Sequence, residues 1–221
     1  MNYLKHKISK DELIKIFKNN IDRNIFIGEY QNFKNDDNDI FYQDFIDLNL
    51  SKHGRKIQED AIELSMAVNI YEESYLNEIK KILHSRRQGI IKLVCLDWLF
   101  FFYQRIPKKD FIDLNEYVLK HMEYDLLKIQ AVLNILLFKY TDQLISVLIT
   151  CFNHSNDPAI FYRLNNALTN HELAKSFTNS TIYLIIDVIN LNGSISKNQK
   201  NEIIDRLRQF ALRRVDNRQE Y

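Results

Sequence analysis

From Lys56 onward, apolar residues recur at helical spacing in segments separated by short polar breaks. Four breaks carry helix start or stop signals: Asp110, Thr141-Asp142, Asn156-Asp157-Pro158 and Asn192-Gly193. Together they indicate a chain of consecutive helices joined by short loops. The predicted helices are 56–70, 72–85, 88–105, 111–123, 125–140, 142–154, 157–169, 171–190 (with a break near Asn179–Ser180) and 196–214.

The densest apolar segment is Gly89–Arg105, GIIKLVCLDWLFFFYQR, which contains the only tryptophan of the chain, Trp98. On a helical wheel its apolar side chains point in nearly every direction, and such a helix must be covered on most sides. The segment is too short and too interrupted to cross a bilayer, which requires about 20 apolar residues. We therefore predict that it is the central buried helix of an all-helical protein.

The predicted helices differ in how many apolar faces they carry. Segment 125–140 has two polar strips, one of them formed by Gln130 and Asn134, with apolar residues on both sides of each strip. Segment 196–214 has a single apolar stripe, as does the segment that follows the capping box Ser9–Glu12. A stacked helical array needs two apolar faces on interior helices and one on terminal helices.

A weak internal period supports a stacked array. Ala61, Cys95, Ala131 and Leu164 hold similar positions in similar helices, at offsets of 34, 36 and 33 residues. This spacing fits one helical hairpin per repeat.

Hairpins such as YDLLKIQAVLNILLFKYTDQLISVLITCF (124–152) resemble those of the HEAT-like and armadillo-like α-solenoids. The resemblance covers residues 56–214 and lies in the helical pattern. It implies a short right-handed α-α superhelix of stacked hairpins, curved so that its groove binds another macromolecule. We expect a single domain over residues 1–221, with an N-terminal cap region at 1–55 and a tail at 215–221.

The amino-acid composition gives further evidence on fold class, on nucleic-acid binding and on location. The chain contains only four Gly and two Pro residues, which favours helices over a β fold rich in turns. A net charge of +1 lacks the basic excess of a protein whose main task is to bind nucleic acid. Cys95 and Cys151 lie in apolar helical segments and are expected to be buried, reduced thiols. The first residues are charged throughout, so we expect a cytoplasmic protein with no membrane association.

Motifs for catalysis or metal binding are missing from the sequence. The six histidines never pair at i, i+3 or i+4, and no HExxH, CxxC, GxSxG or phosphate-binding glycine loop is present. We expect histidines at helix ends to interact with terminal carbonyls. The expectation is a protein with no catalytic residue, no metal and no cofactor.

Asp97 is the first candidate for a functional residue, because it is an acid within an apolar helix. It either binds a buried backbone or arginine partner, or shares a thin polar strip with Gln104, about 20° away on the wheel. In the second case the strip would line a binding face together with asparagines of later helices, namely Asn134, Asn165 and Asn166. An acid beside a tryptophan is also similar to the helical-repeat DNA glycosylases, and an enzyme of that kind is the alternative function.

Charge is unevenly distributed along the chain. Acids gather early, including Asp36, Asp37 and Asp39 in a stretch expected to be a solvated loop, and arginines gather late, at Arg206, Arg208, Arg213, Arg214 and Arg218. The segment NIFIGEYQNF before the acids is expected to be irregular or strand-like. Such charge separation would steer a charged protein partner. We expect a protein-binding module, most specifically an immunity protein whose early acids bind a basic toxin domain.

Overall fold

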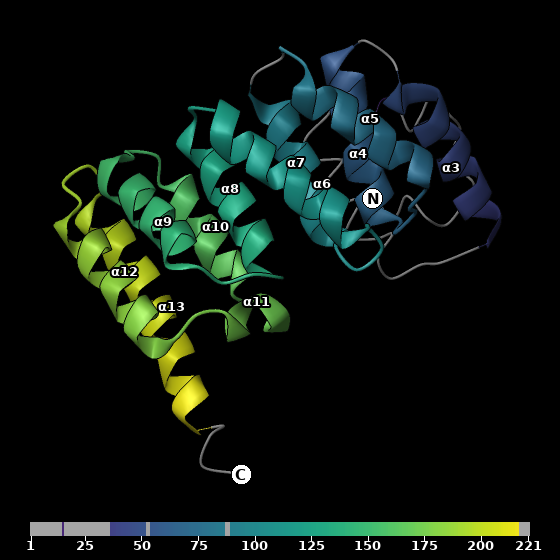
Figure 1. Ribbon diagram of the computed structural model, residues 1–221. Coiled ribbons are helices and arrows are strands. Elements are labelled where there is room, and N and C mark those ends of the chain that lie inside the picture. The colour runs from purple at the N-terminus through teal and green to yellow at the C-terminus, as the bar shows by residue number, and fades with distance from the viewer. Residues whose placement is uncertain (1–14, 16–35, 52–53, 87–88, 217–221) are drawn as a thin grey trace. The chain divides into compact units, whose positions relative to one another are not determined.

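The computed structural model of the protein describes Lys15 and residues 36–51, 54–86 and 89–216, and the side chains of 36–41 and 213–216 lie outside this description. The described elements, shown in Figure 1, are α3 (Asp36–Leu50), α4 (Arg55–Ala67), α5 (Glu73–His84), α6 (Ile90–Phe101), α7 (Lys108–His121), α8 (Asp125–Leu136), α9 (Asp142–His154), α10 (Ala159–Ala167), α11 (His171–Lys175), α12 (Asn179–Leu191) and α13 (Lys197–Asp216). No strand occurs within these ranges. The predicted all-α class is confirmed.

Every helix predicted from Lys56 onward is present, in most cases shortened by a few residues. The predicted break near residue 179 is real: Thr178 Oγ1 accepts a hydrogen bond of 3.1 Å from Thr181 N and begins α12. Thr141 caps α9 in the same way. Asp110, however, does not start a helix, because α7 begins at Lys108 and contains Asp110 in its first turn. Apart from Lys15, the helix predicted after Ser9 lies outside the described residues, as does the segment NIFIGEYQNF.

The acidic stretch at residues 35–39 was expected to be a loop, and this expectation is wrong. Residues 36–39 form the first turn of α3, a position where helices commonly carry acidic residues. The helix is set by the apolar residues that follow, since Tyr42, Phe45 and Ile46 are all at most 4% exposed. The α3 helix packs against α4.

The chain forms two compact units, residues 1–107 and 108–221. In the first unit, α4 packs against α3 and α6, and α5 packs against α6. Most side chains of α6 are buried, as its apolar wheel predicted. The cover is incomplete at both ends of the helix, where Ile90 is 59% and Phe101 is 50% exposed.

In the second unit, α8 packs against α7, α9 and α10, and α12 packs against α9 and α13. Because α8 has neighbours on several sides, ten of its twelve residues are buried, as its two apolar faces predicted. The last helix, α13, buries a single stripe that includes Ile203, Leu207 and Ala211.

The four residues of the predicted repeat occupy equivalent places. Ala61, Cys95, Ala131 and Leu164 lie on α4, α6, α8 and α10, which are alternate helices of the chain, and all four are 0% exposed. Within each unit the two helices concerned pack together, α4 with α6 and α8 with α10. The handedness of the stack and the single domain remain predictions.

Candidate functional site

Trp98 is a core residue of the first unit, only 1% exposed. Its Nε1 donates a hydrogen bond of 2.9 Å to Ser65 Oγ on α4, and its ring stacks on Tyr71 at a centroid distance of 5.5 Å. These contacts leave no ring face available to a nucleic-acid base. The neighbouring Asp97 is half-buried on α6, close enough to Cys95 to help burial raise the pKa of that thiol.

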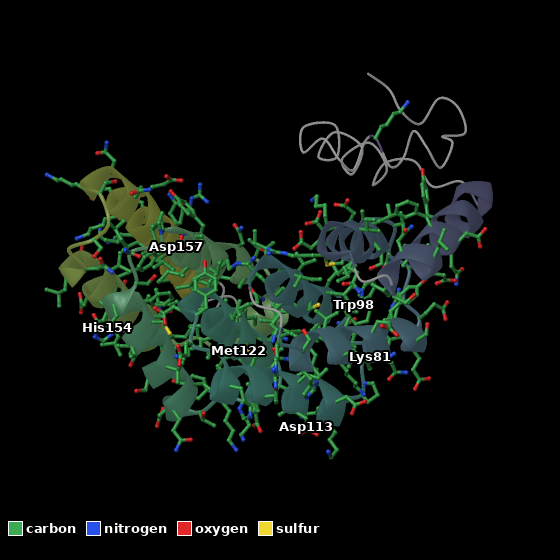
Figure 2. The ribbon with its side chains drawn as sticks, turned by 90° about the horizontal axis from the view of Figure 1, so that it is seen from above. Lys81, Trp98, Asp113, Met122, His154 and Asp157 are labelled. Atoms are coloured by element: carbon green, nitrogen blue, oxygen red, sulfur yellow. The ribbon has the colours of Figure 1, made fainter. Side chains whose placement is uncertain are left out.

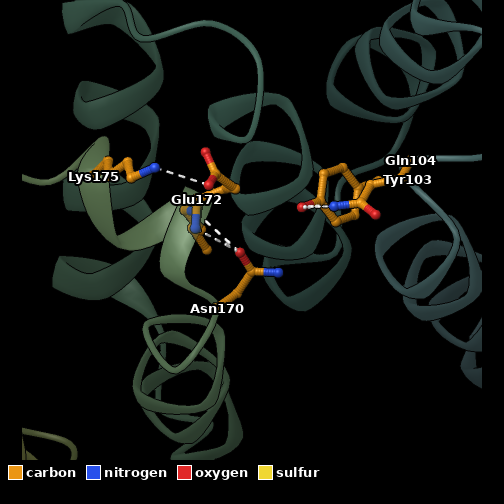
Figure 3. A network of polar contacts seen from close by, with 6 residues as sticks. Tyr103, Gln104, Asn170, Glu172 and Lys175 are labelled. Atoms are coloured by element: carbon orange, nitrogen blue, oxygen red, sulfur yellow. Dashed lines mark hydrogen bonds and ion pairs between the residues drawn. The ribbon is translucent and has the colours of Figure 1, made fainter.

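Gln104 does not share a helical strip with Asp97. The prediction assumed one helix through residue 105, but α6 ends at Phe101 and the next four residues form turns. Gln104 is exposed, and its Nε2 donates a hydrogen bond of 2.9 Å to the Tyr103 hydroxyl (Figure 3).

Asn134 lies at the centre of a buried polar network, not on a ligand-facing surface. Its side chain is 0% exposed, donates 2.8 Å to Asn115 Oδ1 on α7, and accepts 3.0 Å from Gln130 Nε2. Gln130 Oε1 in turn accepts 2.6 Å from Arg163 on α10, and Asn115 donates 2.7 Å to Phe111 O. The network joins α7, α8 and α10, so the role that this geometry gives Asn134 is structural.

Asn165 and Asn166 line a hollow of about 260 Å³ between α10 and α13, together with Arg206 and Gln209. The Nδ2 atom of Asn165 is buried and has no hydrogen-bond acceptor within the described part of the chain. Arg206 already donates 2.7 Å to Glu202, its neighbour one turn earlier on α13. The structure therefore brings three sequence-predicted polar residues to one place.

The acids at 36, 37 and 39 are on α3, but their side chains lie outside the description. Further along α3, Asp47 lines a hollow of about 280 Å³ with Glu72 and Glu78. The Tyr75 hydroxyl donates 2.6 Å to Asp47 Oδ1, and burial followed by this hydrogen bond raises the pKa of Tyr75 well above its ordinary value. The hollow is acidic, which is the chemistry that the early acids predicted.

A groove between α9 and α12 was not predicted from the sequence. It has a volume of about 330 Å³, and its lining consists of Tyr140, Asp142, Ile145, Ser146, Ile149, Ser180, Thr181 and Leu184. Leu184 is 47% exposed, and Leu191, one heptad further on, is 82% exposed. The sequence did contain a signal, because α12 carries apolar residues beyond those that its buried face requires.

Neither helix of the groove contains Lys or Arg, and the one histidine, His154, lies in the last turn of α9. The sequences DQLISVLITCFNH and NSTIYLIIDVINL contain no Lys or Arg, and their carboxylates, Asp142 and Asp187, are both exposed. Asn192 ties the end of α12 to the end of α9, since its Nδ2 donates 2.7 Å to Phe152 O and 3.0 Å to Ser155 O. The groove therefore lies between two helices fixed to each other.

Two histidines near helix ends, His84 and His154, lie beside backbone carbonyls, as predicted. His84 Nδ1 lies 2.7 Å from Lys80 O, and His154 Nδ1 lies 2.8 Å from Thr150 O. His154, at the end of α9, and Asp113, on α7, are labelled in Figure 2. Among the described residues, no three His, Cys, Asp or Glu side chains are grouped so that they could hold a metal ion.

Within the described ranges, no helix combines the length and the apolar character needed to cross a membrane. Comparisons with protein-family models, with curated proteins and with solved structures found no match to this chain.

Proposed function

We propose that this protein is a non-enzymatic module that binds another protein, and that the α9–α12 groove is its docking surface. The observation that carries the proposal is the exposure of Leu184 and Leu191 on one face of α12, beside a groove with an apolar floor. Burying such side chains against a partner is favourable, and contiguous exposed apolar surface marks interaction sites in soluble proteins.

The alternation of buried repeat positions on α4, α6, α8 and α10 supports a HEAT-like stack of hairpins as the scaffold. In stacked arrays each hairpin contacts its neighbours, so successive helices build extended surfaces suited to macromolecular partners. Fold alone does not assign a function. The surface of α9 and α12 is therefore the basis of the proposal.

The partner we favour is a basic protein, and a cytoplasmic immunity protein that neutralises a basic toxin domain is the most specific form of the proposal. Two surfaces support a basic partner: the hollow with Asp47, Glu72 and Glu78, and the groove helices with no Lys or Arg. A toxin that cleaves nucleic acid must be cationic to hold its substrate. Acidic surfaces would bind it and increase its association rate.

The docking surface is tested by affinity capture of the tagged protein from its native cell, with bound proteins identified by mass spectrometry. Leu184→Asp places a charge in the groove and should abolish capture of the specific partner. Leu212→Asp is the matched control, because Leu212 is 59% exposed on α13 and does not line the groove. Equal capture by both variants would refute the groove as the docking surface.

The immunity form of the proposal has its own test. Once a partner is identified, its expression alone should be toxic, and co-expression of this protein should restore growth. Changing Asp36, Asp37 and Asp39 together to Lys should slow association with a basic partner, and the slowing should weaken as salt rises. Stopped-flow rates equal to wild type would contradict steering by these acids.

A further inference from the structure

We propose that the α9–α12 groove takes one amphipathic α-helix of the partner, with basic side chains flanking its apolar ridge. This inference rests on the proposed function and specifies the partner's chemistry. It is drawn from the spacing of the groove residues, from the exposed apolar side chains that continue the groove, and from the charge of both helices.

The groove has the repeat of a helix-packing surface. On α9 its lining residues are 142, 145, 146 and 149, and on α12 they are 180, 181 and 184. These spacings place each set on one face of its helix. Because α9 and α12 pack against each other, the groove follows the seam between two helices. A third helix fits such a seam when its apolar side chains recur at i, i+3 or i+4, and i+7.

The apolar surface extends beyond the hollow itself. Leu191 lies one heptad after Leu184, which is about 20° away on the wheel, so both belong to the same face of α12. Asp187 lies between them on this face and is exposed. Tyr183, beside Leu184, is 49% exposed. A face two turns long fits a helix, whereas a single protruding side chain would need only the hollow.

The charge of the groove indicates which residues should flank the apolar ridge of the partner helix. Asp142 lies in the lining of the groove, and Asp187 lies on the face that continues it. The two helices contain no Lys or Arg that could neutralise these carboxylates from within the groove helices. A helix with Lys or Arg beside its apolar ridge would pair with both carboxylates, and a helix with acidic flanks would be repelled.

The test uses two synthetic 18-residue helical peptides with the same leucine ridge, one flanked by Lys and the other by Glu. Fluorescence anisotropy with the full-length protein measures the dissociation constant of each. We expect the Lys-flanked peptide to bind at least about tenfold more tightly, since charge repulsion penalises the other. This preference should shrink as salt rises.

Two variants locate the interaction. Leu184→Asp should raise the dissociation constant of the Lys-flanked peptide by about tenfold or more, as expected when a central apolar anchor is lost. Leu212→Asp should leave this dissociation constant unchanged. Changing Asp142 and Asp187 together to Lys should invert the preference, so that the Glu-flanked peptide binds more tightly. The control for charge reversal is Asp205→Lys, because Asp205 is exposed on α13 outside the groove. This control should keep the wild-type preference.

Equal affinity for the two peptides, or a preference that survives the double reversal, would overturn the inference. Binding that Leu184→Asp leaves unchanged would overturn it as well. These failures are separate from failure of the proposed function, because cellular capture that depends on Leu184 would still show a docking surface, for a partner of different chemistry. Sedimentation that shows self-association abolished by Leu184→Asp would make a second copy the occupant and overturn the partner helix.

Discussion

At the scale of single residues, the link between Trp98 and Ser65 can be tested directly. Ser65→Ala removes the acceptor of the buried Trp98 Nε1, and a buried unpaired donor costs about 1–3 kcal/mol of unfolding free energy. Trp98→Phe removes the donor and some packing. The double variant should cost less than the sum of the two single changes, because the first change already breaks the bond. Urea unfolding followed by circular dichroism measures all three, and strict additivity would contradict a stabilising hydrogen bond.

Lys92 is a second residue whose role has a measurable consequence. It is 1% exposed on α6, and its Nζ donates 2.8 Å to each of Leu83 O and Ser85 O at the end of α5. Burial lowers the pKa of Lys92 below its ordinary value of 10.5. Between the folded and unfolded pKa values the unfolded chain binds more protons, so the free energy of unfolding rises with pH.

Because the free energy of unfolding rises with pH only when the buried lysine is present, wild type and Lys92→Met should differ in how their stability depends on pH. The stability difference, wild type minus variant, should increase as pH is raised towards about 10.5, the pKa of the unfolded lysine. Below the folded pKa the difference should be constant. Urea midpoints measured for both proteins across this range test the prediction. A difference that stays flat, or falls with rising pH, would contradict a buried ammonium at this place.

At the scale of helices, the amide network predicts that Asn134 stabilises the second unit and does not bind a ligand. Asn134→Ala leaves Gln130 Nε2 and Asn115 Oδ1 without this partner, and each unsatisfied group costs about 1–3 kcal/mol. Thermal melting should show the loss, while folded protein should still capture the partner. The control is Asn166→Ala, since Asn166 is exposed on α10. If Asn134→Ala melted at the wild-type temperature but no longer captured the partner, Asn134 would have a binding role instead.

Helical periodicity was sufficient to predict the all-α class, because most helices from α4 onward bury a repeated apolar face that the sequence displays. Failures occurred where a local signal competed with that pattern. Asp36 and Asp37 are typical of a loop, yet both belong to α3, because the helix formed by the apolar residues that follow begins at Asp36. The helical period of α6, continued past its end at Phe101, wrongly predicts that Gln104 shares a face with Asp97.

The candidate site was harder to predict than the fold. Asn134 and Asn165 have the same side chain, and a helical wheel does not distinguish them. Asn134 nevertheless finds partners on α7 and α8, whereas Asn165 Nδ2 has no acceptor among the described residues. Which polar residues are satisfied depends on contacts between helices. The α9–α12 groove also arises from tertiary packing, since it exists only where Ile145 and Leu184 are brought together.

At the scale of the whole molecule, the two cysteines give one reporter for each compact unit. Cys95 is 0% exposed in the first unit, and Cys151 is 4% exposed in the second. Burial raises the pKa of both thiols, that of Cys151 to about 11. Because the thiolate is the reactive form, neither should react with iodoacetamide in the native protein near neutral pH.

Labelling during unfolding then tests whether the chain is one cooperative domain, as its sequence predicts. Short iodoacetamide pulses at increasing urea, followed by peptide mass spectrometry, give the unfolding transition at each thiol. A single cooperative domain should expose Cys95 and Cys151 over the same urea range, since two-state unfolding gives coincident transitions for different probes. In a stacked array, cooperativity depends on the interfaces between neighbouring repeats, so separate transitions would mean that the two units unfold independently. In that case the single-domain prediction would be wrong.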